Sequence, residues 1–211
     1  MYIGRIVAIG MTNEGNAAAM YRVSSRSFPN RQAVVNGKNV AIMPREGFED
    51  DLKKNPYITY NCARFVGNYA VVTNGSQTDP ITEKLATGMS PRDAITLSLL
   101  ALDYEHDSLD TPRIVAVIDK TQPVGFLGII RKDAVIVREF PLKKGVAYYL
   151  STYEKNKPCK CNCDEAFTAL TAEEVTEHVI SGGVFADFEK PVTACGVVVN
   201  GDDFEFAVKT V

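Results

Sequence analysis

Three arginines stand within eleven positions in the stretch YRVSSRSFPNR, residues 21–31. No acidic residue of the stretch can neutralise Arg22, Arg26 or Arg31. If the stretch is extended, Arg22, Ser24 and Arg26 project from one face, because alternate side chains of a strand point the same way. Guanidinium and hydroxyl groups held on a rigid strand suit the capture of phosphate or carboxylate. The stretch therefore predicts an anion site, and a solvated edge strand protected by arginines is the alternative.

A second polar group lies in YNCARFVGNYAVVTNGSQTD, where Tyr60 and Asn61 open one strand and Asn74, Gly75 and Ser76 follow the next. A turn that contains glycine, Asn and Ser can present backbone N–H groups to an anion. The same residues also make an ordinary turn, and the sequence leaves both interpretations open.

Four carboxyl groups crowd the stretch LDYEHDSLD, residues 102–110, at the end of a predicted helix. The helix dipole disfavours negative charge there. A buried Glu105 would have a raised pKa and could exchange protons near neutral pH. The alternative is a solvated acidic loop, and the pattern does not say which carboxyl group matters.

The chain has five cysteines, at positions 62, 159, 161, 163 and 195. An odd number with three at alternate positions is not typical of a secreted disulfide framework. Structural zinc sites prefer Cys-x2-4-Cys pairs, which CKCNC does not provide. We therefore expect a reduced surface loop and no metal site.

Composition limits the classes of protein that remain. With 211 residues and 45% hydrophobic residues, the chain can bury a substantial core, and no linker divides it, so we expect one domain over residues 1–211. No apolar run is long enough for a membrane span, and the N-terminus lacks the features of a signal peptide, so we expect a cytoplasmic protein without a membrane partner. A net charge of −3 argues against a nucleic-acid partner.

The chain reads as many short strands with few helices. Strands are expected at 2–9, 17–25, 32–36, 39–43, 57–66, 69–73, 113–118, 124–130, 134–139, 146–152, 192–199 and 203–209, and helices at 80–87, 91–105 and 171–181. Because the helices cluster instead of alternating with strands, the pattern predicts an α+β fold with two stacked, mainly antiparallel sheets and helices outside.

Two of the helices have clear start signals. Ser90 is a predicted N-cap followed by Pro91 and Asp93, and Thr171 is a predicted N-cap followed by Glu174. These signals place the helix starts more firmly than the helix ends.

Several chemistries are excluded by what the chain lacks. Tyr2 should block removal of Met1, so no Cys, Ser or Thr becomes a free N-terminal nucleophile. G-x-S-x-G, Walker and Rossmann motifs are absent. The residues alone therefore indicate an α+β protein with an arginine-lined anion pocket and a carboxyl group placed for proton transfer.

Long motifs of the chain match a known family in order. They are MYIGR, YRVSSRSFPNR, NPYITYNC, TNGSQTD, LSLLALDYE, DTPRI and STYE, which together span residues 1–154, with weaker matches in GGVFADF and PVTA. With these motifs the chain resembles the archaeal-type IMP cyclohydrolase family. Residues 155–170, which contain the cysteine run, are not part of the resemblance.

The resemblance implies an activity and a fold. Members of the family close the purine ring in the last step of de novo IMP synthesis. The carboxamide nitrogen of 5-formamidoimidazole-4-carboxamide ribonucleotide (FAICAR) attacks the formyl carbon, and water is lost. The implied fold is the four-layer αββα sandwich of N-terminal-nucleophile hydrolases, with the active site between the sheets. No metal or cofactor is required.

The resemblance also implies site residues. Its catalytic arginine and glutamate fall on Arg31 and Glu105. We expect Arg31 to stabilise the oxyanion and Glu105 to transfer protons, although Arg26 and Arg31 could exchange roles. The expected substrate-binding residues are Arg22, Ser24, Arg26, Asn30, Tyr60, Asn61, Asn74, Gly75, Ser76, Arg113 and Tyr153.

Two other functions remain as alternatives, a non-catalytic purine-nucleotide-binding protein and an amidohydrolase on the same fold. The expected partner is the nucleotide substrate itself, FAICAR or its product IMP. The sequence leaves the oligomeric state open, and a homo-oligomer remains an option.

Overall fold

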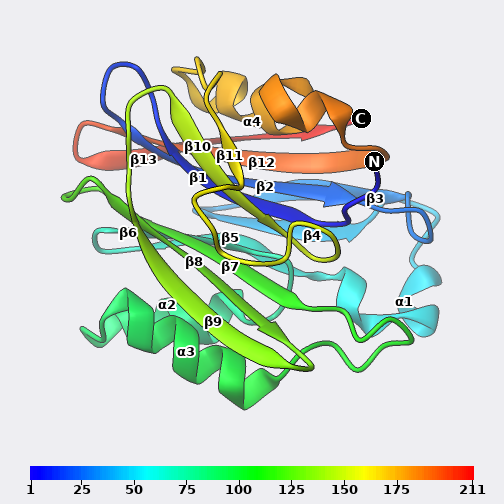
Figure 1. Cartoon of the computed structure of the whole chain (residues 1–211). Helices are drawn as coiled ribbons and strands as arrows, with labels where there is room; N and C mark the ends of the chain where they lie inside the picture. Colours follow the sequence, from blue (N-terminus) through cyan, green and yellow to red (C-terminus); the bar gives the residue numbers. More distant parts are fainter.

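Two β-sheets stack face to face in the computed structural model, which describes all residues 1–211 (Figure 1). One sheet has six strands in the order β11 (Cys163–Asp164), β10 (Val146–Ser151), β1 (Ile6–Met11), β2 (Ala17–Ser24), β12 (Pro191–Asn200) and β13 (Asp203–Thr210). The other has seven, in the order β3 (Arg31–Asn36), β4 (Asn39–Pro44), β5 (Tyr60–Val66), β6 (Tyr69–Thr73), β7 (Arg113–Asp119), β8 (Val124–Arg131) and β9 (Ala134–Pro141). Neighbouring strands are antiparallel throughout.

Helices cover the outer faces of both sheets (Figure 1). The helix α4 (Ala172–Ser181) packs on the six-stranded sheet, and α2 (Thr78–Ala86) and α3 (Pro91–Leu102) pack on the seven-stranded sheet. Short helices occupy the loops: α1 (Asp51–Lys54) and the 3-10 helices η1 (Pro56–Ile58) and η2 (Gly183–Asp187). The predicted α+β sandwich with two mainly antiparallel sheets and outer helices is confirmed.

Apolar side chains fill each of the three spaces between the four layers. The largest cluster lies between the sheets, a second between the six-stranded sheet and α4, and a third between the seven-stranded sheet, α2 and α3. Strands β7 and β12 are buried on both faces along nearly all their length, as their continuous apolar runs predict.

The predicted helix starts are present. The Ser90 hydroxyl accepts a hydrogen bond from the Asp93 N–H at 3.3 Å, and the Thr171 hydroxyl accepts one from the Glu174 N–H at 3.3 Å. The end of α3 differs from its prediction: the helix stops at Leu102, because Asp103 has a φ of 58°, outside the helical region. Residues 103–105 are therefore free to turn away from the helix axis.

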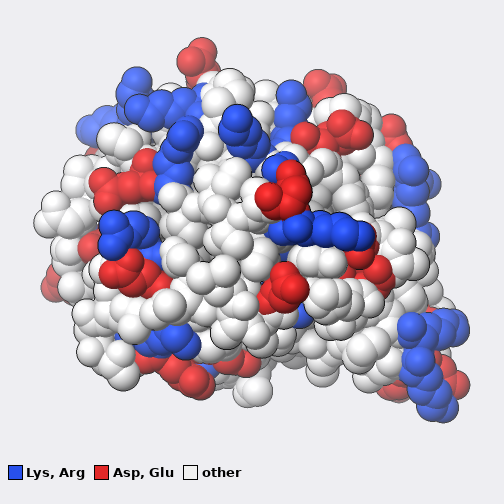
Figure 2. Space-filling view, turned by 60° about the horizontal axis from the view of Figure 1, so that its bottom comes forward, with Lys and Arg blue, Asp and Glu red and all other residues white.

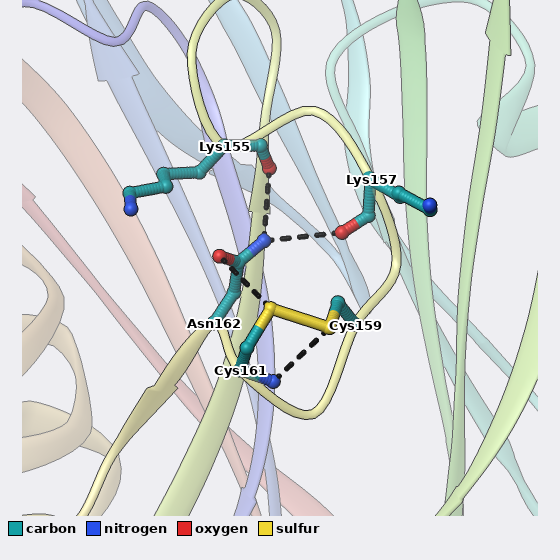
Figure 3. Close-up of a disulfide and its surroundings, with 5 residues drawn as sticks. All are labelled: Lys155, Lys157, Cys159, Cys161 and Asn162. Carbon is teal, nitrogen blue, oxygen red and sulfur yellow. Dashed lines mark hydrogen bonds between the residues drawn. A yellow bond between two sulfur atoms is a disulfide. The ribbon is translucent and has the colours of Figure 1, made fainter.

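The expectation for the cysteine run was right about a loop and wrong about its oxidation state. Residues 152–162 form the loop between β10 and β11, and a disulfide joins Cys159 to Cys161 in its second half (Figure 3). Cys163 carries a free thiol, as do the buried Cys62 and Cys195.

None of the helices has the length and hydrophobicity needed to cross a lipid bilayer.

On the face shown in Figure 2, lysines and arginines are interspersed with aspartates and glutamates around a largely uncharged area. That face therefore carries no large region of a single charge.

Candidate active site

A cavity of about 340 Å³ opens where the ends of strands from both sheets meet. Its charged lining residues are Arg5, Arg26, Arg31, Glu105 and Asp107. Its aromatic and apolar lining residues are Tyr2, Phe28, Tyr57, Ile58, Leu109 and Tyr153, and Ser25, Ser27 and Asn55 complete it. The volume falls within the range of about 300–1,000 Å³ that small-molecule sites occupy.

Glu105 is the buried carboxyl group of the cavity, with only 1% of its side chain exposed. Its Oε2 accepts a hydrogen bond from Arg5 Nη2 at 3.0 Å, and its Oε1 lies 3.8 Å from Arg113 Nη1 without a hydrogen-bond partner. Burial raises the pKa of Glu105, and the positive charges of Arg5 and Arg113 partly oppose that rise. The carboxyl group thus combines a raised pKa with a free acceptor oxygen.

The loop after α3 places Glu105 in the cavity. The Glu105 N–H donates to the Thr111 carbonyl at 2.8 Å, which folds residues 105–111 back on themselves. Asp107 holds this fold, because its carboxylate accepts bonds from the N–H of Thr111 at 3.0 Å and from the Thr111 hydroxyl at 2.7 Å. Asp103 and Asp110 are 49% and 44% exposed, so Glu105 is the one buried acid among the four.

Arg31 lies at the start of β3 and is only 2% exposed. Its Nε donates to the Phe28 carbonyl at 3.1 Å, and its two terminal nitrogens make no hydrogen bond within the chain. The hydroxyls of Tyr21 and Tyr60 lie 2.6 Å apart in the core. Burial raises the pKa of Tyr60, and the charges of Arg31 and Arg5 oppose that rise. The predicted Tyr60 thus borders the arginines without lining the cavity.

Arg26 is the exposed cation of the cavity, with 59% of its side chain accessible. Its guanidinium carbon lies 4.2 Å from the centre of the Tyr2 ring, and its Nη2 lies 3.4 Å from Oε2 of Glu189. The acidic neighbour of Arg26 thus comes from outside the stretch 21–31, since Glu189 approaches from a distant part of the chain. Tyr153 also lines the cavity, as expected, with its hydroxyl 3.4 Å from that of Thr111.

Arg22 lies away from the cavity and is fully buried. Its terminal nitrogens donate to the carbonyls of Val179, Ile180, Phe185, Phe188 and Glu189, and its Nε donates to the Ser24 hydroxyl at 3.0 Å. Burial lowers the pKa of Arg22 to about 10, so the group remains protonated at neutral pH. This corrects the expectation that Arg22 and Ser24 face the substrate together with Arg26.

Two predicted asparagines are engaged in structural bonds outside the cavity. The Asn61 amide donates to Asp79 Oδ1 at 2.9 Å, on the side of the sheet that α2 covers. The Asn74 side chain is fully buried, where its Oδ1 accepts from the Ile114 N–H at 2.8 Å and its amide donates to the Pro112 carbonyl at 2.9 Å. Neither is placed to contact a ligand in the cavity.

Asn30 and Ser76 also lie outside the cavity lining. The Asn30 carbonyl accepts from the Arg45 N–H at 2.9 Å, and Ser76 is exposed without a hydrogen bond. Their positions next to Arg31 and Gly75 in the sequence do not bring their side chains to the cavity.

Gly75 and Arg113 lie directly behind Glu105. Arg113 Nε donates to the Asp103 carbonyl at 2.8 Å, and its Nη1 donates to Gln77 Oε1 at 3.2 Å. A Cβ atom at position 75 would lie 2.7 Å from Arg113 Nη1 and 3.4 Å from Glu105 Oε1. A glycine is therefore needed at position 75 for Arg113 to approach the carboxyl group.

Arg5 is the main site residue that reasoning from the sequence missed. It is 14% exposed, and its Nε is buried without a partner. It precedes β1 in the motif MYIGR, which belongs to the family resemblance. Because Arg5 lies in an apolar stretch far from the other arginines, its type and spacing gave no separate signal.

Comparisons with known proteins place this chain in a family. The family model described as "IMP cyclohydrolase-like protein" matches residues 2–203. A relative from Methanocella arvoryzae is 50% identical over 209 residues, which cover 99% of this chain and 98% of the relative. Relatives from Methanosphaera stadtmanae and Methanocaldococcus jannaschii are 46% and 40% identical, each over 99% of both chains. All three are named IMP cyclohydrolase.

Proposed function

Since the chain belongs to the family of IMP cyclohydrolase-like proteins, we propose that it is an IMP cyclohydrolase, which converts FAICAR to IMP. The family resemblance of its motifs is confirmed by these comparisons. The observation that carries the proposal is the buried Glu105 carboxyl group in a cavity that also holds Arg31. The reaction joins two groups of one substrate, so positioning and charge stabilisation are what the protein must supply.

Arg31 acts on the formyl oxygen in this proposal. When the carboxamide nitrogen attacks the formyl carbon, that carbon becomes tetrahedral and its oxygen becomes anionic. The terminal nitrogens of Arg31 are free of intramolecular hydrogen bonds and belong to a side chain fixed by Phe28. A donor held in this way stabilises the developing charge without reorganisation.

Glu105 accepts the proton that the carboxamide nitrogen loses and returns it to the oxyanion, which becomes a hydroxyl. The formamide nitrogen then loses its own proton, which the same carboxyl group passes to the hydroxyl, so that the hydroxyl leaves as water and the ring double bond forms. Its Oε1 has no partner and its pKa is raised, so both the ionised and the protonated form are accessible to the reaction. Arg5 and Arg113 flank the carboxyl group and favour its ionised form, which the first step requires.

The remaining walls of the cavity suit a nucleotide. The rings of Tyr2, Phe28, Tyr57 and Tyr153 offer faces on which the base can stack. Arg26 is the exposed cation beside Ser25 and Ser27 and is proposed to hold the phosphate. The proposed site does not include the predicted residues whose side chains lie outside the cavity lining. These are Arg22, Ser24, Asn30, Asn61, Asn74 and Ser76.

The test is ring closure by the full-length protein, followed by the absorbance of IMP after subtraction of spontaneous closure. Turnover of FAICAR supports the proposal. Tight binding of IMP without turnover would instead establish a non-catalytic nucleotide-binding protein. The proposal includes a cytoplasmic location, since the substrate is a metabolite of nucleotide synthesis, and it needs no metal or cofactor.

A further inference from the structure

Residues 155–162 of the loop between β10 and β11 lie outside the proposed nucleotide cavity and carry a feature that ring closure does not use. Figure 3 shows the disulfide between Cys159 and Cys161 at the tip of this loop. Cys161 is exposed and Cys159 is half-buried, whereas Cys62 and Cys195 are buried in the core. Reagents in solvent can therefore reach the loop disulfide and not the core thiols.

We propose that Cys159 and Cys161 form a redox-active pair that exchanges thiol and disulfide states with small thiols or dithiols in solution. The inference does not rest on the proposed ring closure. It rests on four features of the loop: the exposure of its sulfurs, the small size of its ring, its backbone scaffold and its charge.

The disulfide contributes little as a cross-link. It joins residues only two positions apart, and the restriction that a disulfide places on the unfolded chain grows with the length of the loop it closes. A bond that closes so short a loop holds no distant parts of the fold together. Its opening is therefore expected to leave the sandwich intact.

The loop is held in shape by bonds that do not involve the disulfide. Asn162 is 6% exposed, and its amide donates to the carbonyls of Lys155 and Lys157 at 3.4 and 3.1 Å (Figure 3). Its N–H donates to the Cys159 carbonyl at 3.1 Å, and its own carbonyl accepts from the Tyr149 N–H at 3.0 Å. Because these bonds persist when the sulfurs separate, the two cysteines stay close and can rejoin.

The surroundings favour the reduced sulfurs as thiolates. The N–H of Cys161 donates to the sulfur of Cys159 at 3.3 Å. The loop of residues 152–162 contains three lysines and one acidic residue, Glu154, and none of these four forms an ion pair, so the loop keeps a net positive charge. Nearby positive charge and N–H donors stabilise a thiolate, which is the reactive form of cysteine.

These features assign the two sulfurs different roles. An external thiolate attacks the more exposed sulfur of Cys161, the S–S bond breaks, and Cys159 leaves as the thiolate that the Cys161 N–H stabilises. A second external thiolate then attacks the mixed disulfide and releases Cys161. Two electrons pass from two external thiols, which become a disulfide, to the protein, which becomes a dithiol, and the reverse steps use an external disulfide as oxidant.

The test equilibrates the full-length protein with mixtures of reduced and oxidised dithiothreitol, followed by acid quenching and maleimide labelling of free thiols. Trypsin cleaves after Lys160, between the two cysteines, so their fragments remain joined only where the disulfide is present. We expect the fraction of disulfide-linked fragments to follow the ratio of oxidised to reduced dithiothreitol. Protein that starts oxidised and protein that starts reduced should give the same curve. A joined species that never forms, or that excess reduced dithiothreitol cannot open in the folded protein, overturns the proposal.

Matched variants distinguish the exchange of Cys159 and Cys161 from any reaction of the neighbouring Cys163. Cys163→Ser removes the third thiol of the run, which packs partly against the core between the sheets, and should titrate like the wild type. If that variant loses the exchange, Cys163 is a member of the pair and the assignment fails. Asn162→Ala should shift the balance toward the dithiol, because the loop then loses the side-chain bonds to the Lys155 and Lys157 carbonyls and keeps only the backbone bonds of residue 162.

The assigned roles have their own test. With oxidised glutathione, the free Cys161 of Cys159→Ser should take up glutathione several-fold faster than the free Cys159 of Cys161→Ser. Equal or reversed rates overturn the assignment of Cys161 as the attacked sulfur. Neither variant touches the nucleotide cavity, so failure of ring closure and failure of exchange are separate results.

Discussion

Arg5 Nη2 lies 3.0 Å from Glu105 Oε2, although the two residues are 100 positions apart. Arg5 immediately precedes β1 of the six-stranded sheet, and Glu105 lies on the segment that leads into β7 of the seven-stranded sheet. The pair therefore bridges the two sheets at the wall of the cavity. Burial of the carboxyl group and the adjacent charge act in opposite directions on the pKa of Glu105, and burial prevails.

Replacing Arg5 with Met removes the charge and keeps much of the side-chain volume. Since Arg5 lowers the pKa of Glu105 against the effect of burial, we expect that pKa to rise further in Arg5→Met. The acid limb of the pH profile of kcat/KM, which reports the ionised base, should then move to higher pH. Arg26→Met is the control, since Arg26 is exposed and should leave the limb in place. An unmoved limb in Arg5→Met would show that Glu105 is not the titrating base.

Replacing Glu105 with Gln keeps the shape of the side chain and removes its ability to accept a proton. We expect kcat for ring closure to fall by about 10²–10⁴-fold, with the affinity for IMP, measured by calorimetry, nearly unchanged. Asp110→Asn is the matched control in the same loop, because Asp110 is 44% exposed and pairs with Lys132 at 2.9 Å. Full activity in Glu105→Gln would transfer the proton-transfer role to another group.

The raised pKa of Glu105 also predicts a pH dependence of stability. The folded protein binds the proton of this carboxyl group more tightly than the unfolded chain does. Proton binding by Glu105 therefore adds to the free energy of unfolding below the ordinary pKa of glutamate. This added stability is lost as the pH rises through the raised pKa of the folded state. Urea unfolding of wild type and Glu105→Gln across this range should show a shallower decline for the variant. Parallel curves would mean that burial does not set the pKa of Glu105.

Substitutions of Arg31 and Arg26 should have different kinetic effects, because Arg31 is proposed to act in the chemical step and Arg26 in substrate binding. Arg31→Met removes the proposed oxyanion donor, and loss of such a donor costs about 3–4 kcal/mol, or about 10²–10³-fold in kcat. Arg26→Met should instead raise KM with little change in kcat, because a phosphate contact is the same in substrate and transition state. Steady-state kinetics of both variants decide the matter. If the two effects are exchanged, so are the two roles.

Much of the fold could be predicted from the sequence because its signals are local. Alternating or continuous apolar runs mark the strands, and N-caps such as Ser90 and Thr171 mark helix starts. The errors lie where a local pattern is overridden. The predicted strand 2–9 begins only at Ile6, after Gly4 with a φ of 77°, and α3 ends three residues early at the positive φ of Asp103. Both departures deliver site residues, Arg5 and Glu105, to the cavity.

The site could be predicted only in part, because which face of a strand looks into a cavity is a tertiary property. All eight residues of β2 are buried, so alternation could not tell whether Arg22 faces the other sheet or the helix layer. Likewise, the carbonyls that surround Arg22 come from residues 179–189, whose position no local pattern reveals. Arg31 and Glu105 were identified by the resemblance, and the structure adds Arg5 as their neighbour.

Arg22 is a direct test of this difference between sequence and structure. The sequence predicts that Arg22 binds the substrate, whereas the structure indicates that it stabilises the fold. Arg22→Met would leave several buried carbonyls without donors, at about 1–3 kcal/mol for each unsatisfied group. We therefore expect urea unfolding to show that the free energy of unfolding falls by at least about 3 kcal/mol. The KM and kcat of the protein that remains folded should stay near the wild-type values. Arg26→Met, which removes an exposed ion pair, should change stability by less than about 1 kcal/mol. Normal stability in Arg22→Met together with a raised KM would return Arg22 to the substrate-binding site.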